Sequence, residues 1–252
     1  MDNLTIIFRE LGDSWNQFFR KLARRYLRKA VEIALTGTDL VPAVRAAITS
    51  HDFEMQHLRN VPFCRTRHEL FKACLEQVQA TDGLHLEFGV YKGDSINFLA
   101  KLAPDRIFTG FDSFEGLPET WTTGSRAGAF NLGGKLPPVR KNVSLVKGFY
   151  DATLPGFCAE NKESEVAFLH VDCDLYSATR DLLAQLRPML RPGTIIIFDE
   201  FYNYSEWLDH EFRAWSEFVE TENVKFTYIG YIRTGEQVAL RIDSFGTAVR
   251  AT

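Results

Sequence analysis

The stretch LHLEFGVYKGDSINFLAKL, residues 84–102, decides the fold. Its first seven residues form a short apolar run interrupted by a glycine, and Ser95–Leu102 has the periodicity of a helix. A strand that turns through glycine into a helix is the opening unit of an α/β domain. The rest of the chain repeats this alternation.

Further apolar strands follow at regular spacing. They are IFTGFD (107–112), VSLVKGF (143–149), VAFLHVD (166–172) and TIIIFD (194–199), with a helix predicted over Ala178–Leu190. Continuous apolar strands belong in the middle of a parallel sheet that is covered on both faces. Residues 225–233 and 237–243, joined at Thr234-Gly235, predict an antiparallel hairpin. The sequence therefore predicts a Rossmann-like, doubly wound α/β sheet with an antiparallel C-terminal hairpin.

The residues before this core predict a helical arm. Residues 14–35 place aromatic side chains on one side and arginines and lysines on the rest, and further helices are expected over Leu40–Thr49 and Thr66–Ala80. The arm can pack on the domain or on a second subunit as a lid, or its basic face can rest on an anionic membrane surface. We favour packing, and with it a homo-oligomer, because amphipathic helices in soluble proteins are usually packing elements.

Composition excludes several classes of protein. The net charge is −4, with +4 on residues 1–30 and −8 on the remainder, which argues against general nucleic-acid binding. The four cysteines lack a CxxC pair, so neither a zinc knuckle nor a disulfide framework is expected, and they suit a reducing cytosol. No apolar run is long enough for a membrane span, and no signal-peptide core is visible. We expect a cytoplasmic protein.

The loop Glu87–Ser95 follows the first core strand. Its glycines, Gly89 and Gly93, permit a tight turn and a close approach to a ligand, at a helix start whose free N–H groups favour an anion. The spacing is GxxxG and not the dinucleotide pattern GxGxxG. The acid two residues before Gly89 suits the ammonium of an amino acid. The alternative is a plain structural turn.

Two later strand ends carry candidate nucleoside contacts. Asp112, followed by Ser113, lies where an acid can accept both ribose hydroxyls, and the alternative is a helix cap. Tyr150 and Asp151 could enclose adenine and accept its amine. The alternative there is core aromatics with a capping aspartate.

Four acids end two of the predicted parallel strands: Asp172, Asp174, Asp199 and Glu200. Ligands bind at this edge of open α/β sheets, and clustered carboxylates repel one another unless a cation or protons neutralise them. Oxygen ligands of this kind suit Mg²⁺. The alternative is that Asp174 caps the next helix and Glu200 faces solvent. His210 is a candidate general base, or a histidine on a helix surface.

Five motifs together resemble a known family. LEFGVYKGDS, FDSFEGLPET, GFYDATLP, FLHVDCDLYSAT and RPGTIIIFDEF occur in the order found in the macrocin O-methyltransferase-like family. These are class I methyltransferases that often modify sugars or phenols of bacterial natural products. The resemblance covers about Arg65–Glu220. It implies a seven-stranded sheet, S-adenosylmethionine as cofactor, a methyltransferase domain over residues 65–252 and an arm or lid over 1–64.

The resemblance also implies roles for the candidate residues. Glu87 and Gly89 would hold the methionine part, with Phe88, Tyr91, Gly93 and Ser95 as further cofactor contacts. Asp112 and Ser113 would hold the ribose, and Tyr150 and Asp151 the adenine. Asp172, Asp199 and Glu200 would bind Mg²⁺, with Asp172 or His210 taking the acceptor proton. The family usually has two aspartates where this chain has Asp199-Glu200. The longer Glu disturbs the tight geometry of Mg²⁺, so the need for a metal stays open.

The expected function is therefore O-methylation of a small-molecule hydroxyl, on a sugar or phenol, with help from Mg²⁺. Three alternatives stay open: a nucleotide-dependent oxidoreductase, a family member with another reaction or a metal-independent mechanism, and a non-catalytic binding protein. The insert 120–140, rich in glycine and proline, is expected to shape the acceptor pocket. The residues alone do not identify the acceptor.

Overall fold

The structure is a computed structural model that describes residue 26 and residues 40–79, 82–122 and 124–246. The helix predicted over residues 14–35 lies outside the described residues, apart from Tyr26. Within the described part of the chain, no helix is both long and apolar enough to cross a membrane.

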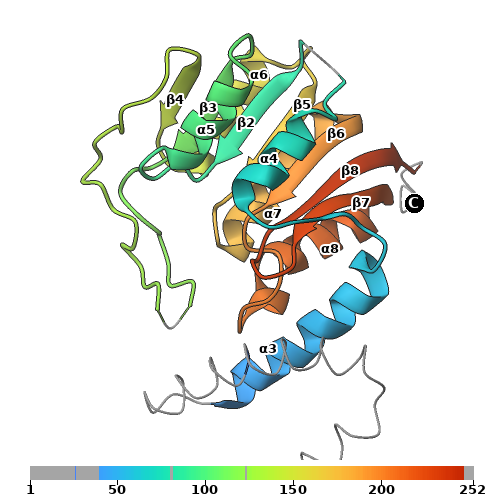
Figure 1. The fold of residues 1–252 in the computed structure, drawn as a ribbon. Helices are drawn as coiled ribbons and strands as arrows, with labels where there is room; N and C mark the ends of the chain where they lie inside the picture. The colour runs from blue at the N-terminus through green and yellow to red at the C-terminus, as the bar shows by residue number, and fades with distance from the viewer. Residues whose placement is uncertain (1–25, 27–39, 80–81, 123, 247–252) are drawn as a thin grey trace, which may run out of the picture.

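An eight-stranded sheet forms the centre of the molecule (Figure 1). Its strands are β1 Phe63–Cys64, β2 Leu84–Phe88, β3 Phe108–Asp112, β4 Val143–Lys147, β5 Val166–Val171, β6 Leu190–Phe198, β7 Val224–Ile232 and β8 Val238–Phe245. The order across the sheet is β1-β7-β8-β6-β5-β2-β3-β4, and only β8 runs antiparallel to its neighbours. The doubly wound sheet and its antiparallel hairpin are confirmed. The seven expected strands are all present, and the eighth is the two-residue edge strand β1, too short to leave a periodicity in the sequence.

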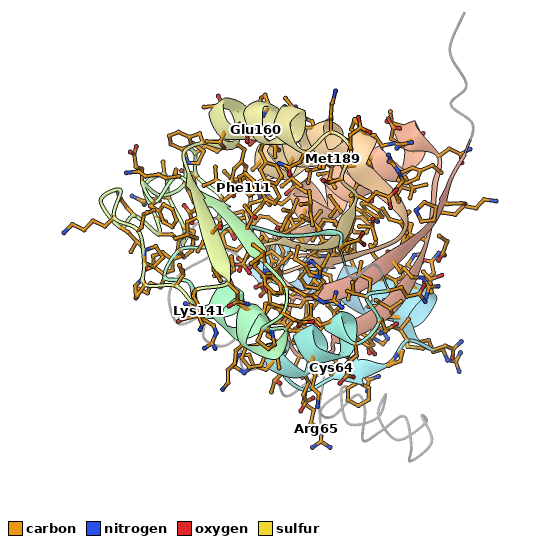
Figure 2. The ribbon with its side chains drawn as sticks, turned by 90° about the horizontal axis from the view of Figure 1, so that it is seen from above. Cys64, Arg65, Phe111, Lys141, Glu160 and Met189 are labelled. Atoms are coloured by element: carbon orange, nitrogen blue, oxygen red, sulfur yellow. The ribbon has the colours of Figure 1, made fainter. Side chains whose placement is uncertain are left out.

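Helices cover both faces of this sheet (Figure 1). On one face lie α4 Arg67–Leu75 and α5 Asp94–Leu102, and on the other α6 Tyr150–Glu160, α7 Tyr176–Leu186 and α8 Glu211–Glu222. α3 Leu40–Phe53 continues into a π-helical turn at Glu54–Leu58, and short 3₁₀ turns occupy Arg187–Met189 and Trp207–Asp209. Figure 2 shows the same layers from above, with Cys64 on the side of α4 and Glu160 on the side of α6.

Two of these helices correct the sequence prediction at its edges. α4 begins at Arg67 because the Thr66 side chain accepts a hydrogen bond from the backbone N–H of Glu69, and it ends at Leu75, before the expected Ala80. α3 extends four residues beyond the expected Thr49. Helix ends depend on caps and tertiary packing more than on periodicity.

The core consists of two apolar layers, one on each face of the sheet. Phe88, Phe111 and Val171 point toward α6–α8, whereas Phe108 and Phe168 point toward α4 and α5. Every residue of β5 is buried, which is why its sequence is apolar at successive positions. Each fully buried large side chain contributes roughly 1.5–3 kcal/mol of transfer free energy, and the strands are held rigidly as a result.

The chain reverses its winding direction between β2 and β5. From β2 it proceeds outward through β3 to β4, and then returns to place β5 and β6 on the other side of β2. The carboxyl ends of β2 and β5 therefore border the crevice where open α/β sheets bind ligands.

Candidate active site

A pocket of about 650 Å³ opens at this crevice. This volume lies in the range of small-molecule and cofactor sites. Eleven of the residues singled out from the sequence line it: Gly89, Tyr91, Ser95, Asp112, Ser113, Tyr150, Asp151, Asp172, Asp174, Asp199 and Glu200. Both expected groups, the glycine loop and the acidic set, follow the carboxyl ends of parallel strands, and they therefore meet in one cavity.

Gly89 sits where the end of β2 contacts the end of β5. Its φ is +93°, and a Cβ added there would overlap the backbone carbonyl of Asp172. The backbone N–H of Gly89 donates to Phe111 (3.0 Å), and that of Asp172 donates to Phe88 (2.8 Å). Only glycine permits this approach. The glycine is therefore required by the positioning of Asp172 as well as by the turn.

The structure places three of the loop candidates away from the pocket wall. Glu87 is fully buried, and its two carboxylate oxygens contact the Ser95 hydroxyl (3.0 Å) and Nδ1 of His170 (2.9 Å). Phe88 is a core residue, stacked on Phe111 with ring centroids 4.6 Å apart. Gly93 is the N-cap of α5 with φ +83°. Glu87 thus orients Ser95 and His170 from behind the wall, and the cofactor contacts expected of the three residues stay predictions.

Asp112 has a structural role and also faces the pocket. One carboxylate oxygen accepts the backbone N–H groups of Val90 (2.9 Å) and Tyr91 (2.7 Å), and the other accepts that of Phe114 (2.6 Å). The capping alternative is therefore realised. A carboxylate offers about four acceptor positions, so one is still open toward the cavity. Tyr150, at the first position of α6, packs edge-on against Phe88 at 5.2 Å and lines the cavity beside it.

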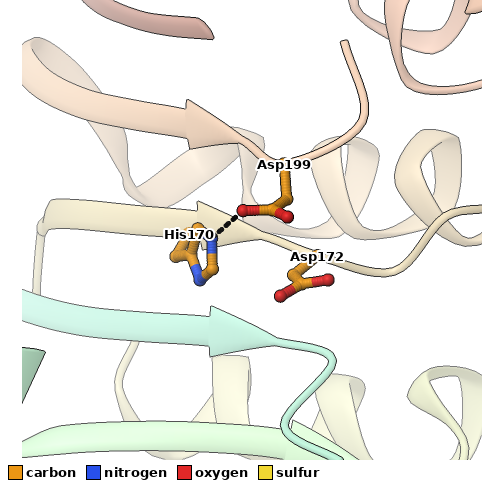
Figure 3. Close-up of side chains that lie close together, drawn as sticks. All are labelled: His170, Asp172 and Asp199. Atoms are coloured by element: carbon orange, nitrogen blue, oxygen red, sulfur yellow. Dashed lines mark hydrogen bonds and ion pairs between the residues drawn. The ribbon is translucent and has the colours of Figure 1, made fainter. Parts of the chain in front are cut away.

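Asp199 accepts hydrogen bonds from three side chains, of which Figure 3 shows His170, with Asp172 beside them. Its Oδ2 accepts hydrogen bonds from Arg67 (2.8 Å) and Gln237 (3.1 Å), and its Oδ1 lies 3.3 Å from Nε2 of His170. Burial alone would raise its pKa, but the hydrogen bond and charge of His170, with Arg67 and Gln237, lower the pKa to about 2. Asp199 is a fixed anion.

His170 joins the two halves of the site. Its ring is fully buried between Glu87 and Asp199, and it packs in a T-shaped arrangement against Phe71 with the ring centroids 4.9 Å apart. Burial opposes the charged ring, yet hydrogen bonds to the two carboxylates outweigh it and raise the pKa of His170 to about 10. His170 therefore carries a positive charge and links Glu87, in the strand before the glycine loop, to Asp199 at the end of β6.

The remaining acids form a second group. Asp172, Asp174 and Glu200 each bring a carboxylate oxygen within 4.8 Å of the others. Burial, followed by neighbouring carboxylates, raises the pKa of Asp172 and of Glu200 well above the usual value, and burial raises that of Asp174 to about 7. Glu200 is 9% exposed, and its Oε2 has no hydrogen-bond partner among the described residues. Asp174 does not cap α7, whose N-cap is Leu175. Both structural alternatives for these acids are therefore wrong.

His210 does not line the pocket. It is the N-cap residue of α8, with its ring 6.4 Å from the rings of both Trp121 and Tyr204, and burial lowers its pKa. His210 therefore lies at the start of α8 and outside the pocket lining, and the general-base role expected of it stays a prediction.

Sequence reasoning missed three contributors to the site: Arg67, Gln237 and Trp121. Arg67 and Gln237 hold Asp199 from 132 and 38 positions away in the chain, so no local pattern connects them. Trp121 lines the pocket from the insert 120–140. A tryptophan in a segment rich in glycine and proline was an available signal for it.

Comparison with known proteins agrees with this geometry. Residues 86–201 match the family described as a methyltransferase domain. The match begins in β2 and ends just beyond β6, so it spans both halves of the pocket. The methyltransferase resemblance expected from the five motifs is confirmed.

A curated relative from Streptomyces olivaceus is 31% identical over 155 residues, which is 51% of this chain. It is the 8-demethyl-8-(2,3-dimethoxy-α-L-rhamnosyl)-tetracenomycin-C 4′-O-methyltransferase, and the alignment spans 57% of its length. Among solved structures, the calicheamicin methyltransferase CalS11 has a TM-score of 0.56 at 20% identity, covering 92% of this chain and 94% of that one. The O-methyltransferase NovP has a TM-score of 0.54 at 22% identity, covering 70% and 79%. These two structures show that the fold is shared.

Proposed function

We propose that this protein is an S-adenosylmethionine-dependent O-methyltransferase that acts on a hydroxyl of a small molecule, with a sugar or glycosylated natural product as the preferred class. One observation carries the proposal. A single pocket places Asp112 and the loop after β2 beside Asp172, at the switch point of a methyltransferase domain. The relative that methylates a rhamnosyl group supports the sugar class.

The cofactor half of the pocket fits a nucleoside joined to an amino acid. The open acceptor position on Asp112, with Ser113 beside it, suits ribose hydroxyls, and Tyr150 and Asp151 lie at the start of α6 where adenine can be enclosed. The wall formed by Gly89–Tyr91 and Ser95 is left for the methionine part. When bound, the sulfonium supplies an already activated methyl group, so the protein needs to position the acceptor and accept its proton.

Asp172 is the residue we assign to that proton. Its carboxyl lines the pocket, and its pKa is raised by burial and by Asp199. A raised pKa makes a carboxylate a better base near neutral pH. Asp199 stays ionised and acts as a positioning residue: it anchors the Arg67 guanidinium, which also lies 3.6 Å from the Asp172 carboxylate.

The acceptor half of the pocket has an aromatic wall. Trp121 and Phe130, from the insert 120–140, line it, and Ser177 is held there by a 2.6 Å hydrogen bond to Glu119. Aromatic faces pack against the C–H faces of sugars while nearby carboxylates accept hydroxyl hydrogens. This wall supports a sugar acceptor.

Calorimetric titration with S-adenosylmethionine and S-adenosylhomocysteine tests the cofactor part. We expect micromolar binding, a loss of at least about tenfold in Asp112→Ala, and a change below about threefold in Asp172→Asn. Mass spectrometry of rhamnosylated acceptors then tests turnover, which Asp172→Asn should abolish. The absence of binding at millimolar cofactor would refute the function, and equal loss of cofactor affinity in Asp172→Asn would refute the role of Asp172.

We also propose that the arm packs on the domain in a cytoplasmic homo-oligomer. The Tyr26 hydroxyl donates a 2.7 Å hydrogen bond to Asn203, and Phe53 of α3 packs against Tyr202 and Trp207. The four cysteines are free. Deleting residues 1–35 should lower the number of subunits per particle, as calculated from the mass measured by light scattering. Neither the full chain nor the deletion variant should bind anionic liposomes. An unchanged number of subunits, or liposome binding that the deletion abolishes, would contradict this arrangement.

A further inference from the structure

We propose that the acceptor pocket continues behind Trp121 into a second subsite, formed by Tyr204 and Glu211, that binds a further hydroxyl of the acceptor ring. This subsite rests on the proposed function, because it takes the ring to be that of the acceptor. It deepens that function, because Tyr204 and Glu211 would decide which acceptors bind although neither takes part in the methyl transfer. The binding of a sugar there can be measured without turnover.

Buried polar atoms without a hydrogen-bond partner gather around Tyr204. Within the described part of the chain, five of them are Nε1 of Trp121, Oε2 of Glu200, the hydroxyl of Tyr204, Nδ1 of His210 and Oε1 of Glu211. The ring of Tyr204 lies 5.6 Å from that of Trp121 and 6.4 Å from that of His210, and the Glu211 carboxylate accepts the backbone N–H of Glu200 at 3.1 Å. Folded proteins leave few buried polar groups unpaired, so such a group indicates a place where a ligand or ordered water supplies the partners.

The unpaired atoms include both donors and acceptors. Burial, followed by the charges of Glu211 and Glu200, raises the pKa of the Tyr204 hydroxyl, which therefore stays protonated. The indole N–H of Trp121 approaches that oxygen as a donor, so the hydrogen of Tyr204 is the part that still lacks an acceptor. Oε1 of Glu211 lacks a donor. A ligand hydroxyl can accept from Tyr204 and donate to Glu211, whereas a cation matches acceptors alone and an anion matches donors alone.

Trp121 separates these groups from the acceptor pocket. Trp121 and Glu200 line the pocket, and Tyr204 and Glu211 do not. Tyr204 is 7% exposed and Glu211 is fully buried, so a ligand in the pocket reaches them only when the half-buried indole turns aside. The acceptor ring would then take the place of the indole and bring one hydroxyl beside Tyr204. Trp121 is thus expected to change its surroundings when a sugar binds.

Tyr202 is a matched control for a buried tyrosine with a structural role. Its hydroxyl donates a 2.9 Å hydrogen bond to the backbone carbonyl of Ile232. Tyr202→Phe leaves that carbonyl without this donor and should lower the melting temperature by about 2–4 °C. Tyr204→Phe removes a hydroxyl that lacks an acceptor, so it should lower the melting temperature by less than about 1 °C.

Titration with methyl α-L-rhamnoside, with and without S-adenosylhomocysteine, tests the subsite. Binding is followed by saturation-transfer nuclear magnetic resonance and by tryptophan fluorescence. We expect Tyr204→Phe to weaken binding about five- to tenfold and Tyr202→Phe to change it less than about twofold. Trp121→Phe should remove most of the fluorescence change. One monodeoxy analogue of the probe should bind the wild-type protein more weakly by the same factor, with no further loss in Tyr204→Phe.

Three results would overturn the proposal. They are equal affinities of the wild-type protein and Tyr204→Phe for the probe, a fall in melting temperature in Tyr204→Phe as large as in Tyr202→Phe, and no binding by the wild-type protein at about 100 mM probe. Titration of the same preparation with S-adenosylmethionine distinguishes two failures. Cofactor binding without sugar binding refutes the subsite alone, and the absence of both refutes the proposed function as well.

Discussion

Gly89 provides the sharpest test of how the fold positions the site. A Cβ at this residue would overlap the carbonyl oxygen of Asp172 and lie 2.6 Å from its carbonyl carbon. Ordinary contact begins at 3.4 Å, so the Gly89→Ala variant must separate the ends of β2 and β5 by about 0.8 Å or more. Gly193 is a matched control: its φ is +98°, close to the +93° of Gly89, but nothing lies within 4 Å of its missing Cβ.

The expected free energies follow from this difference. Both substitutions place an alanine in the left-handed region of backbone conformation, which costs roughly 1–2 kcal/mol. Gly89→Ala adds overpacking of about 1–3 kcal/mol, because it pushes apart strand ends joined by the hydrogen bond from Asp172 to Phe88. Urea denaturation should therefore show a loss of roughly 2–5 kcal/mol for Gly89→Ala, larger by about 1–3 kcal/mol than the loss for Gly193→Ala. Equal losses in the two variants would show that the contact with Asp172 contributes nothing.

Three further substitutions test the structural roles of buried polar groups. The Asn142 amide donates to three backbone carbonyls around the end of α5, so Asn142→Ala should lower the free energy of unfolding in urea by roughly 1–3 kcal/mol, and a loss below about 0.5 kcal/mol would contradict this role. Burial lowers the pKa of His85 to about 4, so the unfolded chain takes up the proton first and stability falls as the pH drops from 6.5 toward 4. His85→Gln should flatten that fall in the melting temperature, and an unchanged slope would refute it. Burial raises the pKa of Glu211 well above 4.5, so stability is lost as the pH rises above that value, and Glu211→Gln should raise the melting temperature more at pH 8 than at pH 5. An equal gain at both pH values would exclude this explanation.

Hydrophobic periodicity was enough to predict the sheet. Strands such as β5 and β6 are buried on both faces, and their sequences are apolar at successive positions for that reason. α6 carries Pro155 and Gly156, which weaken the helical signal, and it was not predicted. α8 was missed although Ala214, Trp215 and Phe218 lie on one buried side, so its periodicity could have revealed it.

The location of the site could be predicted from the sequence, but the hydrogen-bond donors that pair with each carboxylate could not. The rule that ligands bind at the carboxyl ends of parallel strands placed Asp112, Asp172 and Glu200 in one pocket. The rule says nothing about which donors reach each carboxylate, because those come from other elements. Glu87 illustrates the limit: it sits on the expected strand end, yet it is fully buried against Ser95 and His170.

Asp199 and Glu200 are adjacent in the sequence, but their side chains have different surroundings. Asp199 is held by Arg67, the first residue of α4, and by Gln237, which immediately precedes β8. The extra methylene of Glu200 brings its carboxylate within 4.8 Å of oxygens of Asp172 and Asp174, so the glutamate lies in the second group of acids while Asp199 lies with His170 and Asp172 in the first.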